Sequence, residues 1–153
     1  MNAKKDKIKV IGLGNSLAGD DGIGIAVIKR LKKESLPENV EVIDAGCDPL
    51  AILEHLDCEK VIVVDAVKMG RKAGEVVKFT PDDVEIIDDS KSFSLHGIGL
   101  GSALKLARRF YKETDVRIVG IEPYEIKTGK DISEKMLRVI PRAVNSVLEE
   151  IKK

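Results

Sequence analysis

Three polar side chains stand where apolar segments of the chain end. Asp21 follows the glycine-rich segment after the first apolar run, Asp65 closes a run of four branched apolar residues, and His96 lies in the small-residue segment S-L-H-G. Two carboxylates and one imidazole make a three-ligand oxygen and nitrogen set with room for water or a substrate group, which suits nickel or zinc. Asp21, Asp65 and His96 are therefore the candidate metal ligands and catalytic residues.

These side chains can meet only if the elements before them end at one edge of a sheet. Strands alternate with segments of helical apolar spacing along the chain, which predicts right-handed βαβ units. The expected fold is α/β, with a mostly parallel sheet and helices on both faces. In such folds ligands bind beyond the carboxyl ends of the strands. That is the edge at which Asp21, Asp65 and His96 are expected.

The individual elements follow from apolar periodicity and from turn residues. Buried strands are expected at residues 8–13, 40–45, 60–65 and 116–121, and helices at about 20–33, 49–56, 99–111 and from 133. Residues 75–80 alternate like a strand that returns after a hairpin, antiparallel to its neighbour. Ser133 is the candidate N-cap of the last helix, and Pro141 should kink or restart it.

The opening segment reads V-I-G-L-G-N-S-L-A-G-D-D-G-I-G at residues 10–24 and invites comparison with nucleotide-binding loops. A dinucleotide fingerprint needs a third glycine where this chain has Leu17, and a phosphate loop needs lysine where it has Asp20. Two carboxylates at a helix entrance would repel a phosphate. A close glycine-rich backbone with Asp20 and Asp21 suits a cation instead.

Each candidate also has a structural interpretation. Asp20 and Asp21 could cap the following helix and complement its dipole. Asp65 could form a turn, and a lone His96 could be a satisfied structural histidine. His55 lies in a short helical segment with no acidic loop near it in sequence, so we assign it a structural role.

Composition excludes several classes of protein. The chain has 153 residues, which fits a single domain spanning 1–153. Its 26 basic and 26 acidic residues cancel, so no basic surface for nucleic acid or for a membrane is expected. No signal-peptide segment or membrane-spanning apolar run is present, which indicates the cytoplasm. Cys47 and Cys58 match no metal or redox spacing, and both are expected to be reduced and buried.

Four motifs together resemble the hydrogenase maturation endopeptidases. They are the opening G-L-G-N-S-L-A-G-D-D-G-I-G, V-I-V-V-D-A-V, S-L-H-G-I-G-L and V-G-I-E-P. The resemblance implies a three-layer fold with a twisted five-stranded sheet, one strand of which is antiparallel. It also implies that Asp21, Asp65 and His96 bind the metal.

The resemblance implies a peptidase that trims a C-terminal extension from the large subunit of a [NiFe] hydrogenase after nickel insertion. Its partner would be the nickel-loaded precursor, whose nickel acts as a recognition element, with zinc or cadmium as substitutes. No Ser-His-Asp order or activated cysteine supports a covalent intermediate. A carboxylate, with Asp20 as one candidate, could act as general base on a water. We expect a monomer that binds its precursor transiently.

Two other functions compete with this one. A non-catalytic nickel-binding or delivery module could use the same three ligands, although delivery proteins often carry His-rich or Cys-rich tracts and this chain has only two histidines. A nucleotide-binding enzyme is disfavoured by the failed fingerprints. The irregular segments 68–74 and 82–92 are the expected specificity surfaces.

Overall fold

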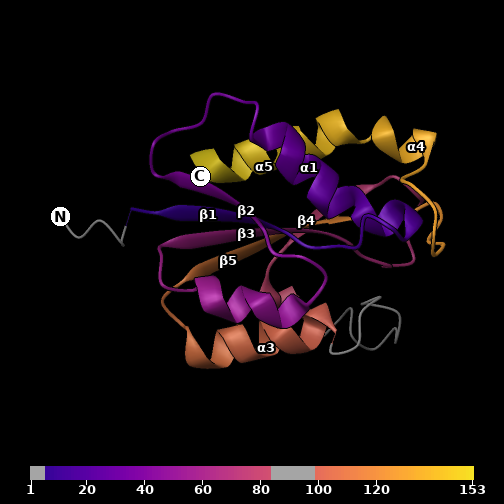
Figure 1. Cartoon of the computed structure of the whole chain (residues 1–153). Helices are drawn as coiled ribbons and strands as arrows, with labels where there is room; N and C mark the ends of the chain where they lie inside the picture. Colours follow the sequence, from indigo (N-terminus) through magenta and orange to yellow (C-terminus); the bar gives the residue numbers. More distant parts are fainter. Residues whose placement is uncertain (1–5, 84–98) are drawn as a thin grey trace.

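The structure is a computed structural model that describes residues 6–83 and 99–153, and its centre is a five-stranded sheet (Figure 1). The strands are β1 (Ile8–Gly12), β2 (Val40–Asp44), β3 (Lys60–Ala66), β4 (Val76–Phe79) and β5 (Asp115–Ile121). The α-helices are α1 (Ile23–Leu31), α3 (Leu100–Phe110), α4 (Glu134–Leu137) and α5 (Ile140–Lys152), and the 3-10 helices are η1 (Gly19–Gly22), η2 (Pro49–His55) and η3 (Pro81–Asp83). No helix within these residues is long and apolar enough to cross a bilayer.

The strand order is β2-β1-β3-β5-β4, and only the β4–β5 pair is antiparallel. The prediction of a mostly parallel sheet with one antiparallel strand is confirmed. The hairpin prediction is wrong, because β4 pairs with β5 and β5 separates it from β3. β5 is a seven-residue strand that is buried along most of its length, so it takes the place beside β3 that a short strand could not fill.

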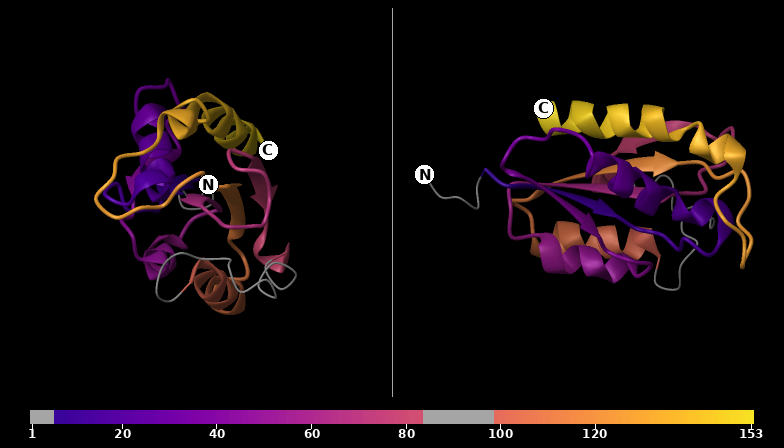
Figure 2. Two further views of the ribbon diagram at one scale, coloured as in Figure 1. Left: turned by 90° about the vertical axis from the view of Figure 1, so that its right-hand side faces the viewer. Right: turned by 45° about the horizontal axis from the view of Figure 1, so that its top comes forward.

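Helices cover both faces of the sheet, with α1 and α5 on one side and η2 and α3 on the other (Figures 1 and 2). All seven residues of β3 are buried, as its run of branched residues predicts. Alternation along this strand sends Ile62 and Val64 into the cluster with α1 and α5, and Val61 and Val63 into the cluster with α3. Two apolar layers therefore fix the position of the central strands.

The first turn of α1 lies directly on the strand ends. A Cβ added at Gly24 would meet the carbonyl oxygens of Leu13 and Val64, so only glycine permits this approach. The helix axis is thereby pressed against the ends of β1 and β3, and η1 is held beside that edge.

The last part of the chain agrees with the sequence-based prediction. The Ser133 hydroxyl accepts a hydrogen bond from the N–H of Met136 at 3.2 Å and caps the short helix α4. Pro141 lies in the first turn of α5, where its missing N–H leaves no helical bond unmade. The helix therefore restarts at this proline.

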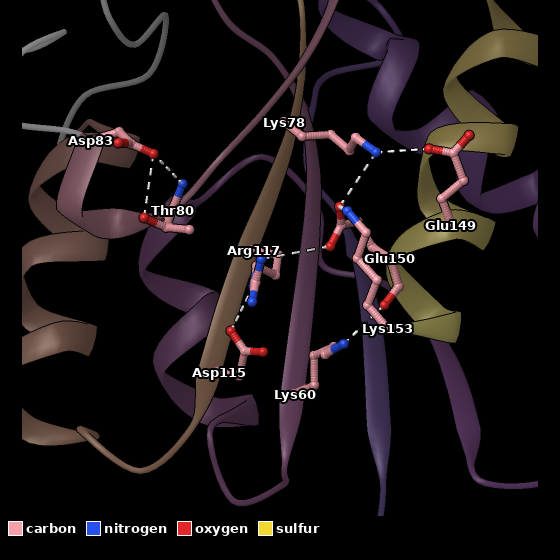
Figure 3. A network of polar contacts seen from close by, with 9 residues as sticks. All are labelled: Lys60, Lys78, Thr80, Asp83, Asp115, Arg117, Glu149, Glu150 and Lys153. Atoms are coloured by element: carbon pink, nitrogen blue, oxygen red, sulfur yellow. Dashed lines mark hydrogen bonds and ion pairs between the residues drawn. The ribbon is translucent and has the colours of Figure 1, made fainter.

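A charged cluster fixes the C-terminal end of α5 to the sheet (Figure 3). The Glu150 carboxylate is almost fully buried and lies 3.5 Å from Lys78 Nζ, 3.9 Å from Arg117 Nη1 and 3.2 Å from Lys153 Nζ. Lys60 Nζ donates to the Glu150 carbonyl oxygen at 2.9 Å. Strands β3, β4 and β5 are thus all linked to one turn of α5.

The two cysteines differ in environment. Cys58 is buried, as predicted, and its Sγ lies 3.3 Å from the carbonyl oxygens of His55 and Lys60. Burial raises the pKa of the Cys58 thiol. Cys47 is exposed, so the prediction that both are buried is wrong. It lies in the turn between β2 and η2.

The close approach at Gly24 predicts a costly substitution. Gly24→Ala should lower the free energy of unfolding by about 1–3 kcal/mol, because the methyl group forces α1 away from the strand ends. Lys29→Ala, at an exposed position of the same helix, should change it by less than about 0.5 kcal/mol. Urea denaturation measures both, and equal stabilities of the two variants would contradict the packing described.

The cluster around Glu150 predicts different effects at neighbouring glutamates. Glu150→Ala should cost about 1–3 kcal/mol of unfolding free energy, since it leaves several cations without their buried partner. Glu149→Ala removes only an exposed pair with Lys78 and should cost less than about 1 kcal/mol. Denaturant midpoints compare the variants. A loss at Glu149 as large as the loss at Glu150 would be inconsistent with the charged cluster around Glu150.

The two cysteine thiols should also differ in their reactivity towards an alkylating reagent. Iodoacetamide should alkylate Cys47 in the native protein and leave Cys58 unmodified until denaturant is added, because Cys58 is buried and its pKa is raised. Peptide mass mapping of native and denatured samples checks this. Equal labelling of both thiols without denaturant would be the opposite result.

Candidate functional site

The candidate site lies at the carboxyl edge of the parallel strands, where residues 13–22 form what we call the opening loop. The N–H of Leu13 donates to the carbonyl oxygen of Val64 at 2.9 Å, and the N–H of Gly14 donates to that of Gly46 at 2.9 Å. These bonds join the ends of β1, β2 and β3. The loop therefore starts from a fixed position beside the end of β3.

Asp21 lies in η1 within this loop and is only 2% exposed. Its Oδ2 accepts a hydrogen bond from the N–H of Asn15 at 3.0 Å, which closes the loop on itself. A Cβ at Gly14, whose φ is +148°, would meet the carbonyl oxygen of Asp21. Glycine at this position lets the two ends of the loop touch, and the carboxylate of Asp21 is held in a defined place.

Asp65 is the next-to-last residue of β3 and is 1% exposed. It lies opposite Gly120 of β5 in the parallel register. By strand alternation its side chain shares the face of Val61 and Val63, which is the α3 side of the sheet. A carboxylate at a fully buried strand end costs free energy unless it is well paired or serves a function.

His96, the third predicted ligand, lies outside the residues that the structure describes. The description resumes at Gly99, and Leu100, the first residue of α3, belongs to the same buried cluster as Leu13 and Val67. Across residues 6–83 and 99–153, no group of three His, Cys, Asp or Glu side chains could hold a metal. The described residues thus contribute two of the three predicted ligands.

Asp20 has a role that the sequence did not predict. It is fully buried, and its carboxylate accepts hydrogen bonds from the N–H groups of Tyr124 at 3.0 Å, Glu125 at 2.9 Å and Ser133 at 2.8 Å. Within the described residues, no side chain caps the start of η1 or α1, so the capping interpretation of Asp20 and Asp21 is wrong. The proposal of Asp20 as general base also fails, because both of its oxygens are engaged and closed off from solvent.

Glu122, from the V-G-I-E-P motif, has a structural role that the sequence does not predict. It is buried just after β5, and its Oε1 accepts from the N–H groups of Met69 at 2.8 Å and Arg71 at 2.9 Å. It therefore holds the loop that follows β3. Its signal in the sequence is the one that identified Asp65, an acidic residue directly after a buried strand.

Two cavities lie at different edges of the sheet. One of about 260 Å³ adjoins the opening loop and is lined by Gly19, Asp20, Glu125, Lys127, Lys130, Asp131 and Ser133. A larger one of about 500 Å³ lies near the start of β5 and the end of α3, at the opposite edge of the sheet. Because Asp21 and Asp65 lie at the carboxyl edge, the larger cavity does not mark the candidate site.

Comparison with known proteins identifies the family of this chain. The hydrogenase maturation protease (HycI) family profile matches residues 25–150. The chain is 37% identical to a Methanocaldococcus jannaschii protein whose name assigns it provisionally to the hydrogenase maturation proteases, over 98% of this chain and 99% of that protein. It is 33% identical to the coenzyme F420 hydrogenase subunit delta of Methanothermobacter thermautotrophicus, over 95% and 94% of the two chains.

Solved structures give the same result. The hydrogenase maturating endopeptidase HybD of E. coli superposes with a TM-score of 0.80 at 25% identity, covering 95% of this chain and 92% of that one. HybD from Thermococcus kodakarensis gives a TM-score of 0.72 at 27% identity, covering 96% and 99%. Members of this family are peptidases, which favours a peptidase over a metal-delivery module. The chain belongs to the hydrogenase maturation protease family and is an endopeptidase.

Proposed function

We propose that this endopeptidase removes the C-terminal extension of a [NiFe]-hydrogenase large-subunit precursor after nickel has been inserted. The observation that carries the proposal is the pair of buried carboxylates, Asp21 and Asp65, at the carboxyl edge of the sheet. The family supplies the reaction class, and these two residues supply the oxygen ligands that nickel bound in a precursor could accept.

The two carboxylates are held by different parts of the fold. Asp21 is fixed by the closed opening loop and Asp65 by the parallel pairing of β3 with β5. Ligands on rigid elements keep their geometry when a metal arrives, and less ordering is then needed on binding. A preformed pair of acids would distinguish a precursor that carries nickel from one that does not.

We assign the third ligand to His96. Its segment S-L-H-G-I-G-L resembles that of the family and precedes α3 in the sequence. Gly99 leads into α3, which packs on the sheet face that Asp65 shares. The imidazole of His96 would complete an oxygen and nitrogen set of three ligands, with zinc or cadmium able to replace nickel.

In the proposed reaction the precursor's nickel is part of the substrate. Asp21, Asp65 and His96 bind it and thereby place the scissile peptide bond beside a water. The water oxygen adds to the carbonyl carbon, the carbon–nitrogen bond breaks, and the proton that the water loses passes to the leaving amine. Because Asp20 is fully engaged, it takes no part in these proton transfers.

We also propose that the protein works in the cytoplasm as a monomeric single domain that binds its precursor transiently.

The loop after β3, held by Glu122, is the proposed specificity surface among the described residues, since it is irregular yet anchored to the sheet. Exchanging residues 68–74 with those of a relative that serves another hydrogenase should change which precursor is processed.

Intact-mass analysis tests the central activity. Candidate large-subunit precursors, nickel-loaded and nickel-free, are incubated with the protein, and we expect loss of a C-terminal peptide only from a nickel-loaded precursor. Asp21→Asn, Asp65→Asn and His96→Ala should each lower the rate by at least about a hundredfold, since each removes a ligand that orients the scissile bond.

The asparagine variants keep the size of the side chain, and the amide oxygen at position 21 can still accept from the N–H of Asn15. Folding should therefore persist, and a thermal melt of each variant provides the control. Cleavage of a nickel-free precursor, or full activity of all three variants, would contradict the proposed function.

A further inference from the structure

The opening loop is bonded to a second loop, residues 122–133, which connects β5 to α4 and which we call the β5–α4 loop. Three main-chain hydrogen bonds join them: Gly19 N–H to Lys130 O at 2.8 Å, Asp20 N–H to Glu125 O at 2.8 Å, and Gly129 N–H to Leu17 O at 2.7 Å. The three bonds accepted by the Asp20 carboxylate reach the same loop. Two segments more than a hundred residues apart thus form one surface beside Asp21.

Asp20 is the centre of this connection. Its two oxygens accept N–H groups from both ends of the β5–α4 loop, at Tyr124 and Glu125 on one side and at Ser133 on the other. Bonds from N–H groups to an ionised carboxylate are stronger than bonds between neutral groups. The two ends of the loop are therefore fixed to the residue that directly precedes a proposed metal ligand.

The joined loops present apolar groups to solvent. Leu17 is 70% exposed although its N–H donates to Asn15 Oδ1 and its carbonyl oxygen accepts from Gly129, so its main chain is held while its side chain is open. Tyr124 is 40% exposed, and its ring lies against Gly74 and 5.8 Å from Lys135 Nζ. A rigid main chain with an exposed apolar side chain loses little conformational entropy when it binds a partner.

We propose that Leu17 and Tyr124 form a rim that binds the polypeptide of the large-subunit precursor, and that Asp20 is the positioning residue that holds this rim beside Asp21. The inference rests on the proposed function for the identity of the precursor. An endopeptidase must hold its chain next to the bond it cuts, and the rim is continuous with the loop that carries Asp21. Leu17 and Tyr124 contact the substrate, whereas Asp20 acts through them.

Two leucine variants test the contact. Leu17→Ala should raise the Kd and KM for a nickel-loaded precursor about tenfold and leave kcat unchanged, because an apolar contact made equally in ground and transition states is lost. Leu106→Ala, at a partly exposed position on α3, is the matched control and should leave both constants unchanged. If Leu17→Ala binds and cleaves the precursor like the unsubstituted protein, Leu17 does not contact the substrate and the proposed rim is contradicted.

Asp20→Asn tests the positioning role. Whichever way the amide turns, its NH₂ group faces an N–H donor, so the hydrogen bonds from one end of the β5–α4 loop are lost. KM should rise about tenfold with kcat retained, and hydrogen exchange at Tyr124, Glu125 and Ser133 should accelerate. In the double variant with Leu17→Ala the two effects should not add, because both act through one surface. Additive effects would reduce Asp20 to a stabilising residue and overturn this role.

A second variant is available if Asp20→Asn does not fold. Ser133→Pro removes the N–H that Asp20 Oδ1 accepts and leaves Asp20 itself intact, and the φ of −69° at Ser133 suits proline. It should raise KM in the same way, and an unchanged KM would contradict the positioning role of Asp20. Ser133→Ala accounts for the separate loss of the helix cap.

Calorimetric binding of the precursor, measured beside cleavage, separates the two proposals. Binding that weakens in Leu17→Ala without any cleavage by the unsubstituted protein would leave the rim standing and refute the proposed function. Cleavage that is unaffected by Leu17→Ala would support the proposed function and refute the rim. A precursor that neither binds nor is cleaved would refute both.

Discussion

The site depends on the close main-chain contact between the first turn of α1 and the ends of β1 and β3. Gly24 lies against the carbonyl oxygens of Leu13 and Val64, and the Leu13 N–H bonds to the latter oxygen. This contact fixes where the opening loop leaves the sheet. The position of Asp21 relative to Asp65 follows, since one belongs to that loop and the other to the same edge of β3.

Around this contact the molecule buries acidic groups, and each has a separate use. Asp20 and Glu122 accept main-chain N–H groups and hold the β5–α4 loop and the loop after β3. Glu150 fixes α5 at another part of the sheet. Burying a carboxylate costs free energy unless it is hydrogen-bonded. The buried acids at the carboxyl edge therefore indicate that the loops there must be held in fixed positions. Asp21 and Asp65 are the two acids for which we propose metal binding.

The sequence predicted most of the scaffold and less of the site. Branched runs identified the central strands, and Pro141 identified the restart of the last helix, because these effects are local. The neighbour of β4 and the partners of Asp20 depend on contacts distant in sequence, and periodicity carries no information about them. The exposure of Cys47 depends on which residues pack over the turn between β2 and η2, and composition does not specify them. Asp65 could be singled out as a candidate from the sequence, because an acidic residue directly after a run of buried apolar residues is unusual in itself.

The central claim is that Asp21, Asp65 and His96 converge on one metal position. Anomalous diffraction from crystals of the protein soaked with zinc, collected on both sides of the zinc absorption edge, tests it directly. The account predicts one strong peak within coordination distance, about 2.0–2.2 Å, of all three side chains. Zinc bound elsewhere in the crystal, with no peak joining these three residues, would contradict it.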